Sequence, residues 1–145
     1  MSDVLSEDAI VLRGAALTRD EAITEAGQLL VTVGAVEPSY VDAMHAREQS
    51  VSTYMGSLLA IPHGTNEAKS AVRATGLSFV RYPDGVDWNG NEVRFVLGIA
   101  SAGDEHLALL GKIAEVFMDA DRVAALEAAQ TKADITAVLD GVSVS

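Results

Sequence analysis

His63 is the residue whose setting in this chain most favours chemistry. It lies in the stretch LAIPHGT, where a short apolar run ends at Pro62 and Gly64 follows the histidine. Proline stiffens the approach to the ring, and glycine lets a bulky group come close to the backbone. An imidazole titrates near neutral pH and can act as acid, base, nucleophile or ligand. His63 is therefore a candidate catalytic residue, although a histidine after a strand can also satisfy a backbone group or face solvent.

A second histidine, His106, lies in GDEHLALLG at the start of an expected helix. Gly103 gives the turn before it conformational freedom. We interpret Asp104 and Glu105 as capping residues, whose negative charge suits the positive end of the helix dipole. A polar residue in a first helical turn is commonly solvated. The alternative is that His106 lies in a ligand site, because it and His63 both follow the carboxyl ends of expected strands, where ligands bind in open α/β sheets.

Arg47 is the candidate cation. It lies near the end of the expected helix that precedes the histidine turn, and a guanidinium there can hold a phosphoryl or carboxylate group with two parallel hydrogen bonds. It could instead complement the dipole of its helix. His45, on the same helix, is expected to point elsewhere and to be exposed. Lys69 could be an accessory cation, and a solvated loop lysine is the simpler interpretation.

Other chemistries compete for these residues. Three histidines and many carboxylates would be enough for a zinc or non-haem iron site, but HExxH and comparable short ligand spacings do not occur. The sequence also has no GxxxxGK[ST] pattern, the usual cradle for nucleotide phosphates. A phosphohistidine needs only a neutral ring nitrogen as nucleophile, a group that orients the ring, and donors for the phosphoryl oxygens. We expect no bound metal and no cofactor.

The elements that must position these residues mix strands and helices along the chain. Apolar runs predict strands at 9–14, 58–61, 74–82 and 92–100. Helical spacing predicts helices at 22–33, from 38 to about 48, and at 104–117, 121–129 and 132–139. Asp84-Gly85 and Asn89-Gly90 are turn dipeptides between the two longest strand candidates, which we therefore expect to pair antiparallel.

Local signals mark several helix ends and faces. The run from Thr18 to Glu21 has the form of a capping box, and Gly34 is a C-terminal stop signal for the same helix. Pro38 is expected to open the next helix. The helix at 104–117 is expected to bury an inner stripe made of Leu107, Leu110, Ile113 and Phe117.

The chain has 145 residues, of which 49% are hydrophobic and 5% aromatic. This length suits a single domain over 1–145 with a substantial core. A core of small aliphatic side chains suits helices packed on a sheet. Together with the element order, it predicts an α/β fold, a three-layer α/β/α sandwich around a mixed β-sheet of about five strands.

The formal net charge of −11 argues against a nucleic-acid partner and disfavours anionic membranes, whereas it would attract a partner with a basic contact face. The absence of cysteine excludes disulfides, zinc–thiolate sites and cysteine nucleophiles in this chain. The N-terminus lacks the pattern of a signal peptide, and no apolar run is long enough to span a bilayer. We expect a soluble cytoplasmic protein.

The sequence resembles the EIIA components of the bacterial phosphoenolpyruvate-dependent sugar phosphotransferase system, in the mannitol/fructose class. The resemblance covers about residues 5–139 and is most specific in REQSVSTYMGSLLAIPHGT, VRFVLGIAS and GDEHLALLGKIA. It implies a phosphocarrier in which His63 takes a phosphoryl group on Nε2 from the phosphohistidine of HPr and passes it to a cysteine of EIIB. The sugar itself is carried by the EIIC permease. The resemblance also implies supporting roles for His106 and Arg47.

Within that class, STYMG before the histidine turn and DEHL after the later strand look more like the mannitol branch than the fructose branch. Ser57-Leu58 departs from the Asn-Gly pair often found there in the family, and an amide would then be missing from the site. Two other functions stay open. One is a regulatory EIIA-like module that controls other proteins, and the other is a metal-dependent hydrolase that uses His63 and His106.

Overall fold

The structure is a computed structural model that describes residues 5–50, 52–65, 70–101 and 105–139, without the side chains of residues 5, 6 and 105–107. Its strands are β1 (Leu5–Val11), β2 (Tyr54–Gly56), β3 (Leu59–Ala60), β4 (Gly76–Trp88), β5 (Asn91–Val96) and β6 (Ile99–Ala100). Its helices are α1 (Arg19–Thr32), α2 (Ser39–Ser50), α3 (Glu105–Phe117), α4 (Ala120–Ala128) and α5 (Lys132–Leu139).

The strands of this described part form one mixed sheet. Their order is β1-β4-β5-β3-β2, and β6 pairs with β4. β1 runs parallel to β4 and β3 runs parallel to β5, whereas β4–β5, β2–β3 and β4–β6 are antiparallel pairs. The pairing of β4 with β5 confirms the antiparallel arrangement expected for the two long apolar segments.

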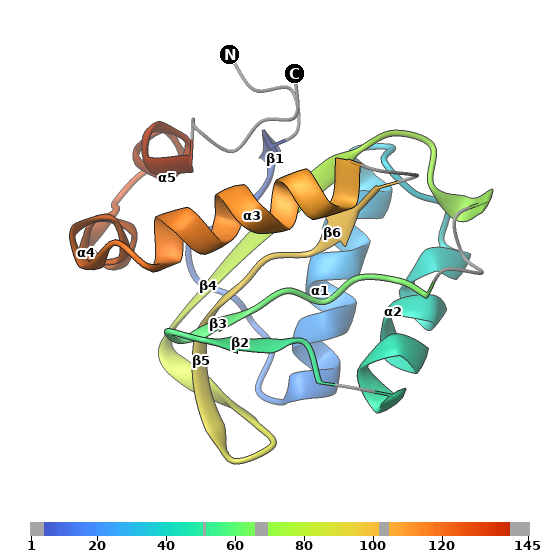
Figure 1. Ribbon diagram of the computed structural model, residues 1–145, viewed down its shortest axis with the longest axis horizontal. Helices are drawn as coiled ribbons and strands as arrows, with labels where there is room; N and C mark the ends of the chain where they lie inside the picture. The colour runs from blue at the N-terminus through green and yellow to red at the C-terminus, as the bar shows by residue number, and fades with distance from the viewer. Residues whose placement is uncertain (1–4, 51, 66–69, 102–104, 140–145) are drawn as a thin grey trace.

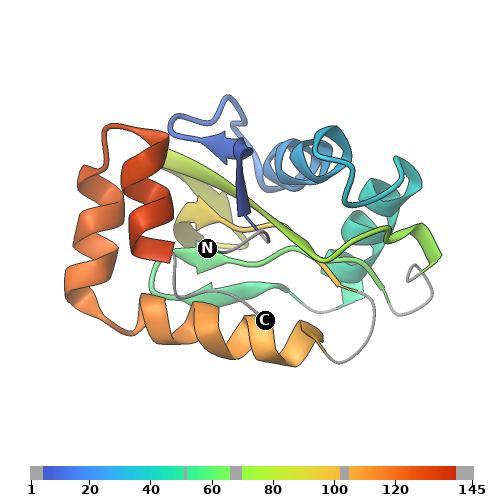
Figure 2. The same cartoon turned by 90° about the horizontal axis from the view of Figure 1, so that it is seen from above.

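Helices cover both faces of the sheet (Figure 1 and Figure 2). α1 and α2 lie on one face and α3 lies on the other, while α4 and α5 follow α3 and reach the edge formed by β1. Arg81 of β4 donates hydrogen bonds to Leu126 O and Ala129 O at the end of α4, at 2.9 and 2.7 Å, which attaches that helix to the sheet. The three-layer α/β/α sandwich around a mixed sheet is therefore confirmed.

Each face of the sheet buries its own apolar cluster because side chains alternate along a strand. Phe79 and Phe95 belong to the cluster under α3, where Phe95 meets Phe117 with ring centroids 5.5 Å apart. Their neighbours Val80 and Val96 belong to the cluster under α1 and α2. Burying one such side chain contributes about 1.5–3 kcal/mol, so both helical layers are held firmly against the sheet.

The ends of α1 follow the local signals in the sequence. Glu21 N donates to Thr18 Oγ1 at 3.2 Å, which is the first half of the capping box. The second half differs, because Glu21 Oε1 accepts from Leu17 N at 2.9 Å instead of from Thr18 N. Gly34 follows the helix with a φ of 79°, a left-handed conformation that glycine adopts without strain.

α3 confirms most of its expected inner stripe. Ile113 and Phe117 are buried and Leu110 is partly buried, and Leu109 is buried as well, whereas the side chain of Leu107 lies outside the described residues. Within the described part of the chain, no helix combines the length and the apolar character that crossing a membrane requires.

The segment before β5 corrects one prediction. β4 continues through Asp84-Gly85 to Trp88, and the chain reverses only at Asn89 and Gly90, with φ of 57° and 92°. Val86 and Trp88 are buried, and their burial outweighs the turn preference of Asp84-Gly85. A register shift between Arg81 and Val86 accommodates the local irregularity.

Two further strand predictions need correction. The first concerns β2, because the sequence pattern predicts neither a strand nor a helix in the stretch where this strand forms. It forms a tight hairpin with β3, and the turn residues Ser57 and Leu58 both have positive φ, 53° and 66°. The second is the segment 92–100, which divides into β5 and β6 at Leu97 and Gly98, although Ser78 N of β4 still donates to Gly98 O at 2.9 Å.

Candidate functional site

His63 lies just beyond β3, where the chain still runs beside β5 and β6. Leu97 N donates to Ala60 O and Ile99 N donates to Pro62 O, both at 3.0 Å, and His63 pairs with Ile99 in a parallel bridge. Pro62 has no N–H, but its carbonyl keeps the pairing intact. The half-buried His63 is therefore held by sheet hydrogen bonds and not by a loose loop.

The imidazole of His63 is oriented by its own strand. Nδ1 lies 2.8 Å from Ile61 O. Because a carbonyl oxygen only accepts hydrogen bonds, a neutral ring in this position carries its proton on Nδ1 and its lone pair on Nε2. The geometry therefore presents Nε2 as the nucleophilic nitrogen of the ring.

Tyr40 holds the turn on the other side of His63. Its hydroxyl accepts a hydrogen bond from Gly64 N at 2.8 Å and donates one to Ile99 O at 2.9 Å. A Cβ at position 64 would lie 2.5 Å from Tyr40 Cε1, so glycine is required by this close approach. Burial raises the pKa of the Tyr40 hydroxyl, and the hydrogen bond from Gly64 N partly offsets this rise. The hydroxyl thus stays neutral and can donate to Ile99.

Tyr40 is buried, and the sequence analysis does not predict a role for it at the site. A buried tyrosine hydroxyl normally needs a partner, and that requirement is the signal that could have indicated it. The expectation that Gly64 lets a bulky group come close is confirmed, and the bulky group is the Tyr40 ring itself.

Arg47 lies in the last turn of α2 and is half-buried. The backbone of His106 lies in the first turn of α3, and its side chain is outside the described residues. Lys69 and Asp104 are also outside them. The juxtaposition of His106 with His63 therefore stays a prediction.

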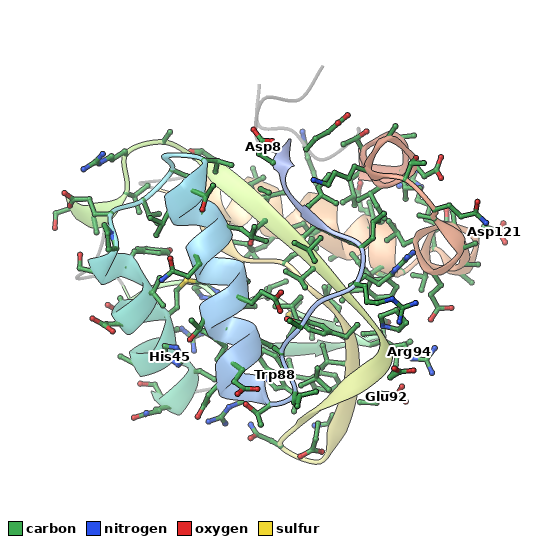
Figure 3. The ribbon with its side chains drawn as sticks, turned by 180° about the vertical axis from the view of Figure 1, so that it is seen from behind. Asp8, His45, Trp88, Glu92, Arg94 and Asp121 are labelled. Atoms are coloured by element: carbon green, nitrogen blue, oxygen red, sulfur yellow. The ribbon has the colours of Figure 1, made fainter. Side chains whose placement is uncertain are left out.

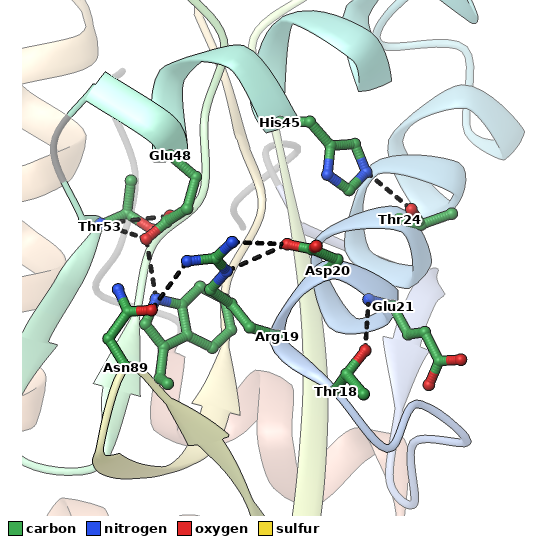
Figure 4. A network of polar contacts seen from close by, with 10 residues as sticks. Thr18, Arg19, Asp20, Glu21, Thr24, His45, Glu48, Thr53 and Asn89 are labelled. Atoms are coloured by element: carbon green, nitrogen blue, oxygen red, sulfur yellow. Dashed lines mark hydrogen bonds and ion pairs between the residues drawn. The ribbon is translucent and has the colours of Figure 1, made fainter.

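His45 is half-buried, whereas the sequence pattern predicts an exposed side chain. Its Nε2 lies 2.8 Å from Thr24 Oγ1, so this ring joins α2 to α1. Figure 4 shows the pair between the two helices, and Figure 3 shows His45 on the outer side of the α1–α2 layer. His45 is a structural residue in this fold.

Ser57 lies at the tip of the β2–β3 hairpin, at the opposite end of β3 from His63. The extended chain from Leu59 to His63 covers about 13 Å at about 3.3 Å per residue. A side chain at position 57 cannot span this distance, so the expectation that an amide there would serve the site is wrong. An open groove of about 560 Å³ at this tip, lined in part by Leu58 and Met118, is equally remote from the histidine.

Among the residues that the structure describes, no three side chains of histidine, aspartate or glutamate gather closely enough to hold a metal ion. The described site therefore consists of a ring nitrogen with a defined lone pair and a hydroxyl that fixes the turn. The place of Arg47 beside this ring stays a prediction, like that of His106.

The chain is similar to known proteins over nearly its whole length. A model of the family described as phosphoenolpyruvate-dependent sugar phosphotransferase system, EIIA 2, matches residues 3–141. The chain is 46% identical over 140 residues to the mannitol-specific phosphotransferase enzyme IIA component of Halalkalibacterium halodurans, and the match covers 97% of both chains.

Solved structures show the same fold. Enzyme IIA in the Escherichia coli complex of enzyme IIAMTL and phosphorylated enzyme IIBMTL is 36% identical, with a TM-score of 0.87 over 94% of this chain and 96% of that one. The nitrogen regulatory protein IIA-Ntr of Neisseria meningitidis is 26% identical, with a TM-score of 0.82 over 94% of this chain and 97% of that one.

Proposed function

The chain belongs to the EIIA type 2 family of the phosphoenolpyruvate-dependent sugar phosphotransferase system, and from this premise we propose that it carries a phosphoryl group on His63. HPr is the donor and a cysteine of EIIB is the acceptor. The observation that carries the proposal is the contact between His63 Nδ1 and Ile61 O, which leaves the lone pair on Nε2.

The transfer needs no external acid or base at Nε2. The lone pair of Nε2 attacks the phosphorus of phospho-HPr, a new P–N bond forms, and the P–N bond to the HPr imidazole breaks. The proton on Nδ1 of His63 stays there and keeps its hydrogen bond to Ile61 O. In the second step a cysteine thiolate of EIIB attacks the same phosphorus, a P–S bond forms, and Nε2 regains its lone pair. Acid that protonates Nε2 should block the first step.

Arg47 and His106 are the groups that we propose to stabilise the phosphoryl oxygens. The phosphoryl group brings negative charge to a protein whose net charge is already −11. The guanidinium of the half-buried Arg47 can offset that charge with two parallel hydrogen bonds. His106 can donate a third hydrogen bond to the phosphoryl group or help to orient the ring of His63.

We propose that the sugar is mannitol or a related polyol, and that the EIIC permease lies downstream in a pathway whose EIIA acts in the cytoplasm. Identity to a relative named mannitol-specific supports this choice. A regulatory role is the second candidate, because the fold is shared with a protein named nitrogen regulatory. The chain is 46% identical to the mannitol-specific relative and 26% identical to the nitrogen regulatory protein, and this difference favours the transport role.

Incubation with phosphoenolpyruvate, Enzyme I and HPr tests the proposal. The wild-type protein should gain one acid-labile phosphoryl group, and His63→Ala should gain none. His45→Gln is the matched control and should be labelled like the wild type, since His45 contacts Thr24 and not the site. If His63→Ala accepts the label as well as the wild type, the assignment is wrong. Onward transfer to a mannitol EIIB separates transport from regulation.

A further inference from the structure

Glu48 is the one acidic side chain buried among the described residues, with 4% of its surface exposed. It lies in the last turn of α2, and its carboxylate accepts hydrogen bonds from Thr53 N at 3.0 Å, from Thr53 Oγ1, and from Trp88 Nε1 at 2.9 Å. Figure 4 shows Glu48 and Thr53 facing each other beyond the helix end. An apolar residue of similar size would often be as stable as a buried charged group. Stability alone therefore does not explain why a carboxylate is buried at position 48.

The contacts of Glu48 lead to His63 through the backbone. Thr53 O accepts a hydrogen bond from Ile61 N at 3.0 Å, and Ile61 O lies 2.8 Å from His63 Nδ1. Thr53 thus fixes the strand segment whose carbonyl orients the ring. Arg47 directly precedes Glu48 in the same helical turn, so the carboxylate also fixes the backbone that carries the guanidinium.

We propose that Glu48 is a positioning residue for phosphoryl transfer. Its carboxylate ties the end of α2 to the strand before His63 and so sets where the guanidinium of Arg47 stands relative to the ring. The inference rests on the proposed role of His63 as phosphoryl acceptor. A misplacement of about 1 Å can slow a reaction about 100-fold, so this link matters for rate in a protein that still folds.

Glu48→Leu and Glu48→Gln separate positioning from general stability. Leucine removes every acceptor, whereas glutamine keeps a carbonyl oxygen for Trp88 Nε1 and Thr53 N, and its amide can donate to Thr53 Oγ1. With saturating phospho-HPr, we expect Glu48→Leu to lower the single-turnover rate about tenfold or more, with KM close to that of the wild type. Glu48→Gln should restore the rate to within about threefold.

The ring of His63 gives a spectroscopic readout that needs no partner protein. Nitrogen NMR of the imidazole should show the Nδ1–H tautomer in the wild type and in Glu48→Gln, and a mixture of tautomers in Glu48→Leu. The only tryptophan of the chain is Trp88, so its fluorescence reports whether the network around Glu48 is intact. If the wild type accepts no phosphoryl group, the proposed function fails, while the tautomer shift still tests Glu48.

A matched pair of variants covers the case in which Glu48→Leu does not fold. Thr53→Val and Tyr82→Phe each remove one hydroxyl that donates to a glutamate, Glu48 and Glu25 respectively. Thr53→Val should slow transfer, whereas Tyr82→Phe should lose stability and keep the wild-type rate. Equal rates for Thr53→Val and Tyr82→Phe would overturn the proposal. So would a folded Glu48→Leu with the wild-type rate and ring tautomer.

Discussion

Tyr82 is a buried residue of β4 whose hydroxyl donates to Glu25 Oε1 at 2.6 Å. Burial, and next the adjacent carboxylate, raises the pKa of Tyr82 above its ordinary value of 10.0, because both oppose formation of the phenolate. At high pH the unfolded chain therefore binds fewer protons at this group than the native protein. By linkage, the free energy of unfolding falls as the pH rises above the unfolded pKa.

We predict that the stabilising effect of this group is complete below about pH 10 and is lost progressively above it. Tyr82→Phe should flatten part of the alkaline decline. At neutral pH it should cost only about 1 kcal/mol, because Glu25 keeps its hydrogen bonds from Ala15 N and Ala16 N. Urea unfolding at a series of alkaline pH values measures both effects. An alkaline decline as steep in Tyr82→Phe as in the wild type would contradict this account.

Residues are predictable from sequence when their contacts are local. The position of His63 follows from Pro62 and Gly64 on either side, and its ring contact reaches only two residues back, to Ile61. The contact between Tyr40 and Ile99 spans 59 positions, so no local pattern could indicate it. For the same reason Glu48 reads as an ordinary residue near a helix end until Trp88 is brought beside it.

The β2–β3 hairpin carries backbone strain that one substitution should relieve. Ser57 and Leu58 both have positive φ, a conformation that asparagine and glycine tolerate far better than other residues. We predict that Ser57→Asn stabilises the protein by about 0.5–1 kcal/mol. Transfer to and from His63 should keep its rate, because the turn lies at the far end of β3. Urea unfolding and the phosphotransfer assay measure the two outcomes.

The β4–β5 hairpin offers the reverse change as a control. Asn89 has a φ of 57° and also accepts a hydrogen bond from Arg19 Nη1 at 2.8 Å. Asn89→Ser should therefore destabilise the protein by at least as much as Ser57→Asn stabilises it. A change in phosphotransfer rate in Ser57→Asn would contradict the remote position of the hairpin tip.

Elements are predictable where local signals agree with packing. Thr18 and Gly34 mark the ends of α1 correctly, because caps are made within a few residues. β2 is a strand only because β3 pairs with it, so its own three residues carry no sufficient signal. β4 runs through Asp84-Gly85 because the buried Val86 and Trp88 extend the sheet beyond a dipeptide that favours a turn.

The layered architecture of the whole molecule follows from two features of the sequence. Strands and helices are mixed along the chain, and the apolar residues are mostly aliphatic, which suits helices packed on both faces of a sheet. The strand order places β3 beside β5 and not beside β4, and this choice brings His63 next to Ile99. Sequence patterns do not encode that neighbour, because parallel pairing is decided by contacts between distant segments. The long-range contacts of Tyr40 and Glu48 could therefore not be predicted from the sequence, and the grouping of His63, His106 and Arg47 in one site stays a prediction.

The net charge of −11 gives the whole molecule a negative field that should attract a donor with a basic contact face. Such steering raises the rate of encounter more than the affinity of the complex. Salt screens it, because the Debye length falls from about 10 Å at 0.1 M to about 3 Å at 1 M. We predict that raising sodium chloride from about 0.05 to about 0.5 M lowers the second-order rate constant for transfer from phospho-HPr about tenfold.

The first-order transfer step inside the complex should respond much less, because the reacting groups are then in contact and largely shielded from ions. Rapid-mixing experiments with limiting and with saturating phospho-HPr separate the two steps. The free energy of unfolding, measured at both salt concentrations, controls for an effect on the fold. A second-order rate constant that is unchanged or rises with salt would mean that apolar contacts, and not the acidic surface, determine the encounter.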